Sequence, residues 1–359
     1  MKLFISIVVL GLTAVFVTNM VIDVAGVNTF RQVTELSRRQ APDELLVWEN
    51  LFDQRAWTKA KLERGCPEIL VLGSSTVGQL DQTMFPGHRL LNGWLTAPTV
   101  EDFEALTAVM SESSCHPATI IVGVDPWLLN AAFKDQRWQS LFDDFLAYHR
   151  NTGKLRAFGL RTVRAWSLFK ERLNFTTTRL TVEHVLRRFR GEPEASAPHL
   201  VSTTGEAYCA TISSAQYIRA NDGHFISCPE FVPTQQEVED IARSYVLNNG
   251  HEVHRWKEVD PHRRARFEIV TRRWSDLGSH VVFVTPPYHP LAYQALRADP
   301  LIAANLDALD RVLSGSGFPY VNLRDPATPG CKASEFEDSH HGARSCVLKV
   351  AARLVPRLP

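Results

Sequence analysis

The chain has 359 residues, of which 45% are hydrophobic and 22% are charged, a composition typical of globular proteins. Its 39 Lys and Arg balance 39 Asp and Glu, so the formal net charge is zero. This balance argues against nucleic-acid binding, because no surplus of positive charge is available to neutralise phosphates.

The first predicted element is an apolar helix at the N-terminus. Residues 3–22 contain no charged side chain, and ~20 such residues in a helix can cross a bilayer core of ~30 Å. We therefore expect residues 1–25 to be an uncleaved signal anchor, with Lys2 on the cytoplasmic side and the rest of the chain extracytoplasmic, periplasmic in a bacterium. Two alternatives are a cleaved signal peptide, for which the sequence offers only poor cleavage sites, and a buried helix of a cytosolic protein.

The predicted elements that follow alternate between helices and strands. Residues 26–64 are charged and helical in pattern, and we interpret them as a stalk. Short apolar runs typical of buried strands lie at 68–73, 89–92, 118–124, 280–285 and 318–323. Helices are predicted at 99–113 and 138–190, from 234 and 261 onwards, and at 343–356, with an irregular Pro-, Ser- and Thr-rich segment at 191–232.

This alternation predicts an α/β fold with a parallel sheet covered by helices on both faces. The predicted domain covers residues 65–359 and carries a large insertion at about 135–260. In such sheets ligands bind beyond the carboxyl ends of the strands, so the residues that follow each strand are the candidates for a functional site.

The first strand is followed by Gly73-Ser74-Ser75. The segment has neither the glycine spacing of a dinucleotide fingerprint nor the Gly-Lys pair of a P-loop. A serine in a tight turn between a strand and a helix exposes its hydroxyl at the edge of the sheet, which suits a nucleophile. The alternative is an ordinary loop.

A nucleophilic serine needs a base, and the base needs an orienting group. Near the C-terminus Asp338 precedes His341 by one helical turn, a spacing that allows the carboxylate to accept a hydrogen bond from Nδ1 while Nε2 takes a serine proton. The neighbouring His340 is an alternative base. The other close pair, His251 and His254, lacks the H-E-x-x-H pattern of zinc proteases, and we predict neither a metal nor a cofactor.

The order of these blocks resembles the SGNH (GDSL-type) hydrolase superfamily. Val71-Leu72-Gly73-Ser74-Ser75 resembles its nucleophile block, with Ser74 in place of the usual Asp, and Asp338-Ser-His-His341 resembles its last block. The segments 92–102 and 121–125 resemble the two blocks between them. The resemblance implies a flavodoxin-like three-layer sandwich with strand order 2-1-3-4-5, and a triad of Ser75, His341 and Asp338.

The resemblance also implies an oxyanion hole formed by the backbone amides of Ser75 and Ala97 and by a side chain at position 125. The family has Asn at that position, whereas this chain has Asp125. An ionised aspartate cannot donate a hydrogen bond and repels the developing charge. Either Asp125 is protonated, or it has another task, or the hole uses only the two amides; a catalytically weak or inactive member is also compatible.

Further expectations concern substrate contacts and cysteines. Trp127 is interpreted either as lining the pocket or as structural, and Tyr288 and His289 as facing the same cleft, with a proline-stiffened loop as the alternative. No Cys-x-x-Cys pair is present, which excludes the common zinc and thioredoxin-like motifs. The strand order of the family implies a Cys66–Cys115 disulfide. We further expect Cys209–Cys228 to close the insertion and Cys331–Cys346 to brace the loop of Asp338 and His341. The alternative is six free thiols.

These features together predict a membrane-anchored, extracytoplasmic serine acyl hydrolase or acyltransferase. The resemblance implies an acyl ester, and first an O-acylated envelope polysaccharide, as the substrate. The alternative is a non-catalytic domain of the same fold that binds protein partners in an envelope assembly.

Overall fold

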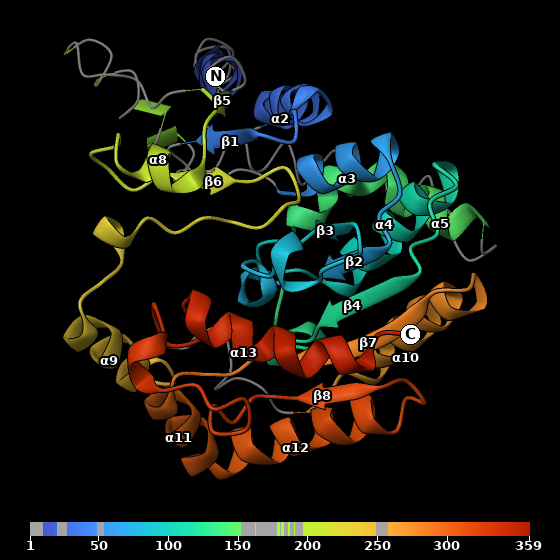
Figure 1. The fold of residues 1–359 in the computed structure, drawn as a ribbon. Helices are drawn as coiled ribbons and strands as arrows, with labels where there is room; N and C mark the ends of the chain where they lie inside the picture. The colour runs from blue at the N-terminus through green and yellow to red at the C-terminus, as the bar shows by residue number, and fades with distance from the viewer. Residues whose placement is uncertain are drawn as a thin grey trace, which may run out of the picture.

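The computed structural model of the chain describes residues 10–19, 27–48, 54–151, 197–248 and 258–359, with single residues between 162 and 190. Its centre is a five-stranded parallel sheet with the order β3-β2-β4-β7-β8 (Figure 1). The strands are β2 (Ile69–Leu72), β3 (Leu90–Asn92), β4 (Thr119–Gly123), β7 (His280–Thr285) and β8 (Tyr320–Asn322). The predicted α/β fold with a parallel sheet is confirmed.

Helices connect these strands and begin at well-defined caps. Thr99 with Asp102, and Thr234 with Glu237, form capping boxes at the start of two helices that the sequence predicted. The helices are α2 (Val27–Arg39), α3 (Gln54–Arg64), α4 (Val100–Glu112), α5 (Phe142–Asn151), α8 (Gly205–Cys209), α9 (Gln235–Ser244), α10 (Pro261–Asp276), α11 (Pro290–Ala298), α12 (Pro300–Ser314) and α13 (Arg344–Leu354).

Alternate side chains of the parallel strands point to opposite faces, and each face has its own core. On one face Leu70, Ile120 and Phe283 pack against residues of α4, α10 and α12. On the other face Val71 and Ile121 pack against residues of α13, which lies across the sheet in Figure 1. Both faces of the sheet are therefore covered by described residues, and the strand ends are where a ligand is expected to bind.

A second, antiparallel sheet corrects the prediction of a helical stalk at 26–64. Helix α2 and helix α3 flank a buried strand, β1 (Glu44–Trp48), which pairs with β5 (His199–Ser202) and β6 (Tyr217–Arg219). Most residues of helix α3 are buried, and its Arg55 forms a fully buried ion pair with Asp102 of α4. The segment therefore belongs to the folded domain, although its charged residues suggested exposure to solvent.

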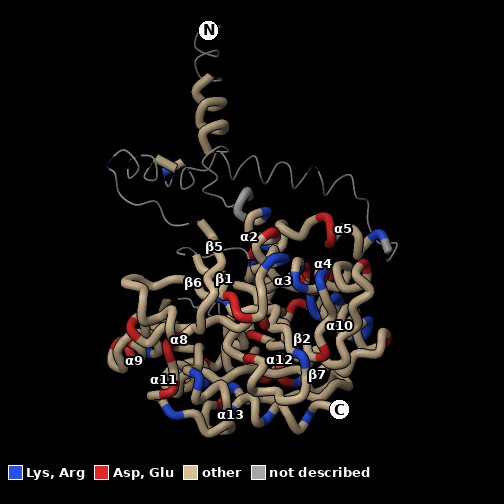
Figure 2. The backbone as a smooth tube through the Cα atoms, turned by 45° about the horizontal axis from the view of Figure 1, so that its top comes forward, with Lys and Arg blue, Asp and Glu red and all other residues tan. Residues whose placement is uncertain are grey.

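The insertion is more ordered than its composition suggested. The segment predicted as irregular contains β5, α8 and β6. The helix predicted at 138–190 begins with a 3-10 turn, Arg137–Leu141, followed by α5; its remainder lies almost wholly outside the described residues. Lys, Arg, Asp and Glu are interspersed over the domain (Figure 2).

The predicted anchor at 1–25 lies mostly outside the described residues. Within it the structure describes residues 10–19, which are helical. Among the described residues, none of the helices has both the length and the hydropathy that a membrane span requires.

The three predicted disulfides are confirmed: Cys66–Cys115, Cys209–Cys228 and Cys331–Cys346. The first joins the segments that precede the neighbouring strands β2 and β4. Disulfides persist in oxidising compartments, so the domain has the character of an extracellular or periplasmic protein.

Candidate functional site

The turn after β2 positions Ser75. Gly73 has φ +147°, and a Cβ at this residue would lie 2.9 Å from the Cα of Gly123 in β4, so only glycine fits. The Oγ of Ser74 accepts a hydrogen bond from the backbone N–H of Thr76 (3.1 Å) and caps the 3-10 turn that begins at Ser75. The Ser75 side chain therefore stands at the carboxyl edge of the sheet on a backbone fixed from both sides.

The structure brings Ser75, His341 and Asp338 together. The Oγ of Ser75 lies 2.7 Å from Nε2 of His341, and Nδ1 of His341 lies 2.6 Å from Oδ2 of Asp338. The other oxygen of Asp338 accepts the backbone N–H groups of His340 and His341, each at 2.8 Å. This geometry places a proton on Nδ1 and leaves Nε2 as an acceptor for the serine proton.

The electrostatics of the pair suit this assignment. Burial alone would raise the pKa of Asp338, but the charge of His341 and the hydrogen bond to it hold this pKa far below its usual range. Burial also opposes the charged imidazole, but the charge and hydrogen bond of Asp338 raise the pKa of His341 above its usual value. An imidazole with a raised pKa is a stronger base, and the ionised carboxylate next to it stabilises the imidazolium that forms.

The alternative base, His340, has a different environment. Its Nδ1 lies 2.9 Å from the Oγ of Ser339, and its ring packs against that of His341 with the centroids 4.2 Å apart. The hydrogen bond from Ser75 goes to His341, so the geometry favours His341 as the partner of the serine.

The second predicted block lies beside the nucleophile turn. The backbone N–H of Gly93 donates to the carbonyl of Val71, and that of Leu95 to the carbonyl of Gly73, both at 2.8 Å. Ala97 follows with φ +46°, a left-handed conformation that is uncommon for a residue with a Cβ. A local strain of this kind is frequent at functional sites, and here it occurs at the residue expected to supply an oxyanion-hole amide.

Ala97 packs in a small apolar cluster with Trp127 and Phe133. The Trp127 ring is only 2% exposed, and its centroid lies 6.4 Å from that of Phe133. Of the two interpretations of Trp127, burial favours a structural role, in which the ring supports the strained turn at Ala97.

Asp125 lies at the carboxyl end of β4 and is 4% exposed. Its Oδ1 accepts a hydrogen bond from the Thr76 hydroxyl (3.1 Å), whereas its buried Oδ2 has no hydrogen-bond partner. Burial raises the pKa of Asp125 to about 6, against the lowering effects of the Ser74 and Thr76 hydroxyls and of His341. The residue at the position where the resemblance implies a third oxyanion donor is thus a carboxyl group with a raised pKa.

Tyr288 and His289 are both buried and lie beside the loop of the histidine, where the backbone N–H of His289 donates to the carbonyl of Ser339 (2.9 Å). The Tyr288 ring packs against Tyr245 and His340. His289 differs from the expectation: Nδ1 accepts the backbone N–H of Leu291 (3.2 Å), which makes the residue the N-cap of α11, and its side chain is fully buried. A capping histidine at this position fixes the loop and does not face a cleft.

Sequence reasoning missed Tyr245 and Arg324, which lie close to Asp125. Arg324 follows β8 and is buried; it donates to Asp310 (3.0 Å), and its Nε and one Nη have no hydrogen-bond partner. Its position just after a strand was a usable signal, because Ser75, Asp125 and Tyr288 were found in that way. Tyr245 follows α9 in the insertion, and nothing in the sequence placed it at the sheet edge.

The insertion also supports the site. Glu337, next to Asp338, accepts hydrogen bonds from Gln79 after the nucleophile (3.0 Å) and from Ser227 of the insertion (2.8 Å). The backbone N–H of Phe225 donates to the carbonyl of Gly78 (2.9 Å). The loop of the histidine and the turn of the serine are therefore linked through a third segment.

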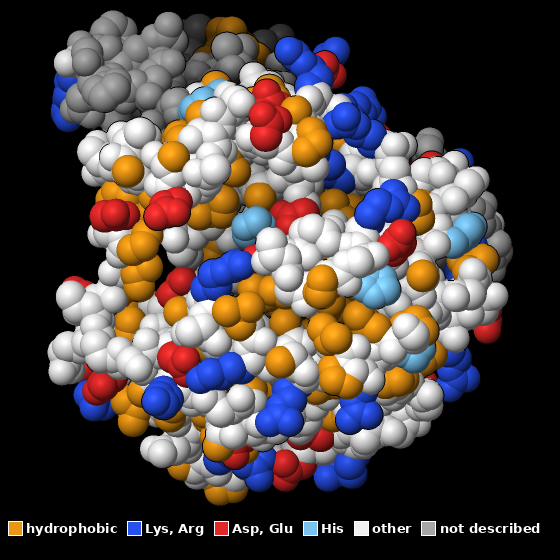
Figure 3. Space-filling view, viewed as in Figure 1, with side chains coloured by type: hydrophobic (Ala, Val, Ile, Leu, Met, Phe, Trp, Pro, Cys, Tyr) orange, Lys and Arg blue, Asp and Glu red, His pale blue; other side chains and the backbone are white. Residues whose placement is uncertain are grey.

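The described part of the domain has small hollows at its surface. One is lined by Thr76, His340 and Gly342 beside Ser75 and His341 and by apolar residues of α13. The face that carries α13 mixes hydrophobic, charged and histidine side chains (Figure 3).

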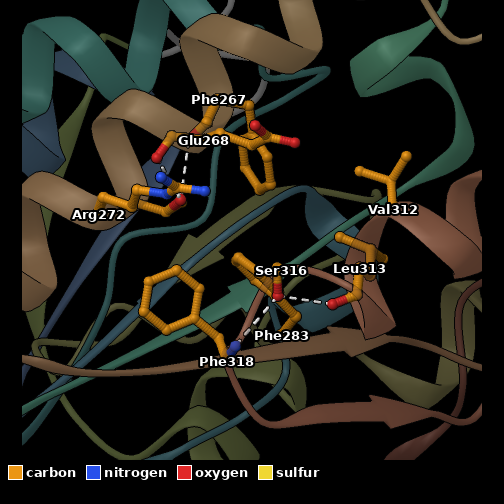
Figure 4. A pocket seen from close by; sticks show the side chains of 9 residues that line it. Phe267, Glu268, Arg272, Phe283, Val312, Leu313, Ser316 and Phe318 are labelled. Carbon is orange, nitrogen blue, oxygen red and sulfur yellow. Dashed lines mark hydrogen bonds between the residues drawn. The ribbon is translucent and has the colours of Figure 1, made fainter.

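Another hollow lies between α10, α12 and β7 (Figure 4). It is formed largely by Phe267, Phe283 and Phe318. Both hydroxyls that line it are satisfied locally, since Ser316 donates to Leu313 and accepts from Phe318, and Thr271 donates to the carbonyl of Phe267. The hollow lacks the converging polar groups of a binding site.

The described residues also contain one group that could hold a metal ion, Asp338, His340 and His341. Both ring nitrogens of His341 are already engaged, one with Asp338 and one with Ser75. A metal would have to displace these hydrogen bonds, so the arrangement fits proton transfer better.

Comparisons with known proteins add no assignment: no family model matches the chain, and no curated protein matches it. The functional argument therefore rests on the geometry of the site itself.

Proposed function

We propose that this protein is an extracytoplasmic serine acyl hydrolase or acyltransferase. The observation that carries the proposal is the continuous hydrogen-bonded chain from the Oγ of Ser75 through His341 to Asp338, with distances of 2.7 and 2.6 Å. It lies at the carboxyl edge of a parallel sheet, where ligands bind in such folds. The resemblance to the SGNH superfamily, including its three-layer fold, is part of the proposal.

In the proposed reaction Ser75 attacks an ester carbonyl while His341 Nε2 takes its proton. His341 then returns the proton to the leaving alkoxide, and an acyl-enzyme forms. Water or an acceptor hydroxyl releases the acyl group by the reverse steps. The amides of Ser75 and Ala97 are proposed to stabilise the oxyanion.

The proposed substrate is an O-acylated envelope glycan or a similar ester. The disulfides favour an oxidising compartment, and the apolar N-terminal segment is proposed to anchor the domain to the membrane. Both features support a substrate that is found outside the cytoplasm, such as an envelope polysaccharide.

A fluorophosphonate probe and small acetyl esters test the proposal. The wild-type protein should be labelled and should hydrolyse the ester, whereas Ser75→Ala should lose both and keep its melting temperature. Ser111→Ala, which removes a serine hydroxyl on α4 far along the chain, is the matched control and should retain both. Labelling of Ser75→Ala, or turnover that persists in it, contradicts the assignment.

A second candidate is a non-catalytic domain of an envelope assembly, and Asp125 is the observation that favours it. A carboxylate at this place would repel an oxyanion. A wild-type protein that stays unlabelled at every pH between 5 and 9 would support this candidate.

A further inference from the structure

Asp125 stands where the third donor to the oxyanion belongs, although an ionised carboxylate cannot donate. We propose that Asp125 serves as a neutral carboxylic acid whose Oδ2–H donates to the oxyanion, so that the active form has Asp125 protonated and His341 neutral. This inference rests on the proposed acyl transfer at Ser75.

The contacts of the carboxyl group indicate which oxygen carries the proton. Oδ1 accepts the hydroxyl of Thr76, the residue directly after the nucleophile. Oδ2 is buried and has no hydrogen-bond partner. Buried polar atoms are almost always paired, so an unpaired oxygen on a carboxyl group that binds Thr76 is suited to a partner that arrives with the substrate. A protonated Oδ2 offers a donor, which is the group that a developing negative charge requires.

The groups that face Asp125 permit the neutral form. Tyr245 and Tyr288 contribute no negative charge, because burial raises the pKa of both phenols above its usual value. Arg324 and His341 favour the ionised carboxyl. The charge of Arg324 is partly offset by its ion pair with Asp310 at 3.0 Å.

Burial is the largest influence and raises the pKa of Asp125 to about 6. Carboxylic acids held neutral in an apolar site are known to act as hydrogen-bond donors to enolate oxygens. The same physical principle applies to a tetrahedral oxyanion.

The proposed step keeps every proton accounted for. The Ser75 Oγ forms a bond to the carbonyl carbon, and the π electrons of the carbonyl move to its oxygen. The serine proton goes to Nε2 of His341. The proton of Asp125 stays on Oδ2 and is shared with the oxyanion through a hydrogen bond. When the intermediate collapses, Nε2 returns its proton to the leaving alkoxide and Asp125 remains neutral.

This arrangement dictates an unusual pH dependence. The pKa of His341 is raised above its usual ~6.5, whereas that of Asp125 is about 6. Between these two pKa values most molecules have Asp125 ionised and His341 protonated. The active form, with Asp125 protonated and His341 neutral, carries the same number of protons and is a minor species. At lower pH activity should fall because neutral His341 becomes rarer, and at higher pH because protonated Asp125 becomes rarer.

Asp125→Asn is the direct test, since a neutral amide donates at every pH. We expect a bell-shaped profile of kcat/KM for the wild type and a single acidic limb for the variant. At pH 9 the variant should exceed the wild type by about 10- to 1000-fold, because a group with a pKa near 6 is protonated in only ~0.1% of molecules there. Asp125→Ala should lose ~100- to 1000-fold in kcat near the wild-type optimum.

An alkaline limb that persists unchanged in Asp125→Asn, or a variant no faster than wild type at pH 9, overturns the inference. If that variant does not fold, the wild type alone decides: its fluorophosphonate labelling rate should decline between pH 7 and 9, and a rate that stays constant to pH 9 overturns the inference. These results differ from failure of the proposed function, in which Ser75 is not labelled at any pH.

Discussion

Removal of the Cys331–Cys346 disulfide is expected to damage catalysis beyond its effect on stability. The bond closes a segment with a sequence separation of 15, and Asp338 and His341 both lie inside it. Chain-entropy arguments give a stabilisation of ~3 kcal/mol for a loop of this length. Both cysteines are buried, so replacement of the pair by Ala adds little new exposure.

The Cys66–Cys115 disulfide is the matched control. Its sequence separation of 49 predicts a larger loss of stability, ~4 kcal/mol, when the pair is removed. The bond joins the segments that precede β2 and β4, at the end of the sheet opposite the site. We therefore expect a greater fall in the free energy of unfolding but an almost unchanged kcat/KM.

Urea unfolding and ester hydrolysis at 25 °C measure the two quantities in the same samples. The Cys331 and Cys346 double variant should lose at least ~10-fold in kcat/KM, because a shift of the base by about 1 Å costs far more than that. If kcat/KM declines in both double variants in proportion to stability, the disulfide has no specific role in holding the histidine and the reasoning fails.

Three further predictions concern single residues. Asp338→Asn should lower kcat by ~10,000-fold, because the imidazole of His341 then loses the partner that fixes its tautomer. Steady-state kinetics at several pH values measures this loss. Arg55→Ala should lower the free energy of unfolding by about 3–5 kcal/mol, since it leaves a buried carboxylate without its charge partner, and a fully folded sample with wild-type stability in urea would contradict it. Gly73→Ala should abolish labelling of the serine, because its Cβ would meet backbone at 2.9 Å; labelling at the wild-type rate would show that the turn tolerates the methyl group.

The strands of the central sheet could be predicted because each is a short apolar run that ends at small residues. The same periodicity placed Ser75 and Asp338 after the first and last strands, and parallel strand ends meet at one edge. Their proximity was therefore available from the sequence, whereas the hydrogen-bond distances were not. The two capping boxes are also a signal that the sequence contains, because the side chains of Thr99 and Thr234 bind backbone groups within one helical turn.

The errors arose where the decisive partner is distant in the chain. The run Glu44–Trp48 carries no local sign of its pairing with β5 and β6. The charged and polar residues of α3 resemble a solvated face, yet Arg55 is buried because Asp102 neutralises it. His289 was assigned to the cleft by its position after a strand, and its capping role depends on the start of α11, which a three-proline segment obscured.

The pairing of β1 has a consequence for biosynthesis. Glu44 emerges from the ribosome long before its partner Ser202, and Leu46 before its partner Arg219. Until both flanking strands have been synthesised, the hydrophobic ribbon β1 has two unpaired edges, a known trigger of intermolecular association. Nascent chains that end before β5 should thus be the species most dependent on chaperones during export.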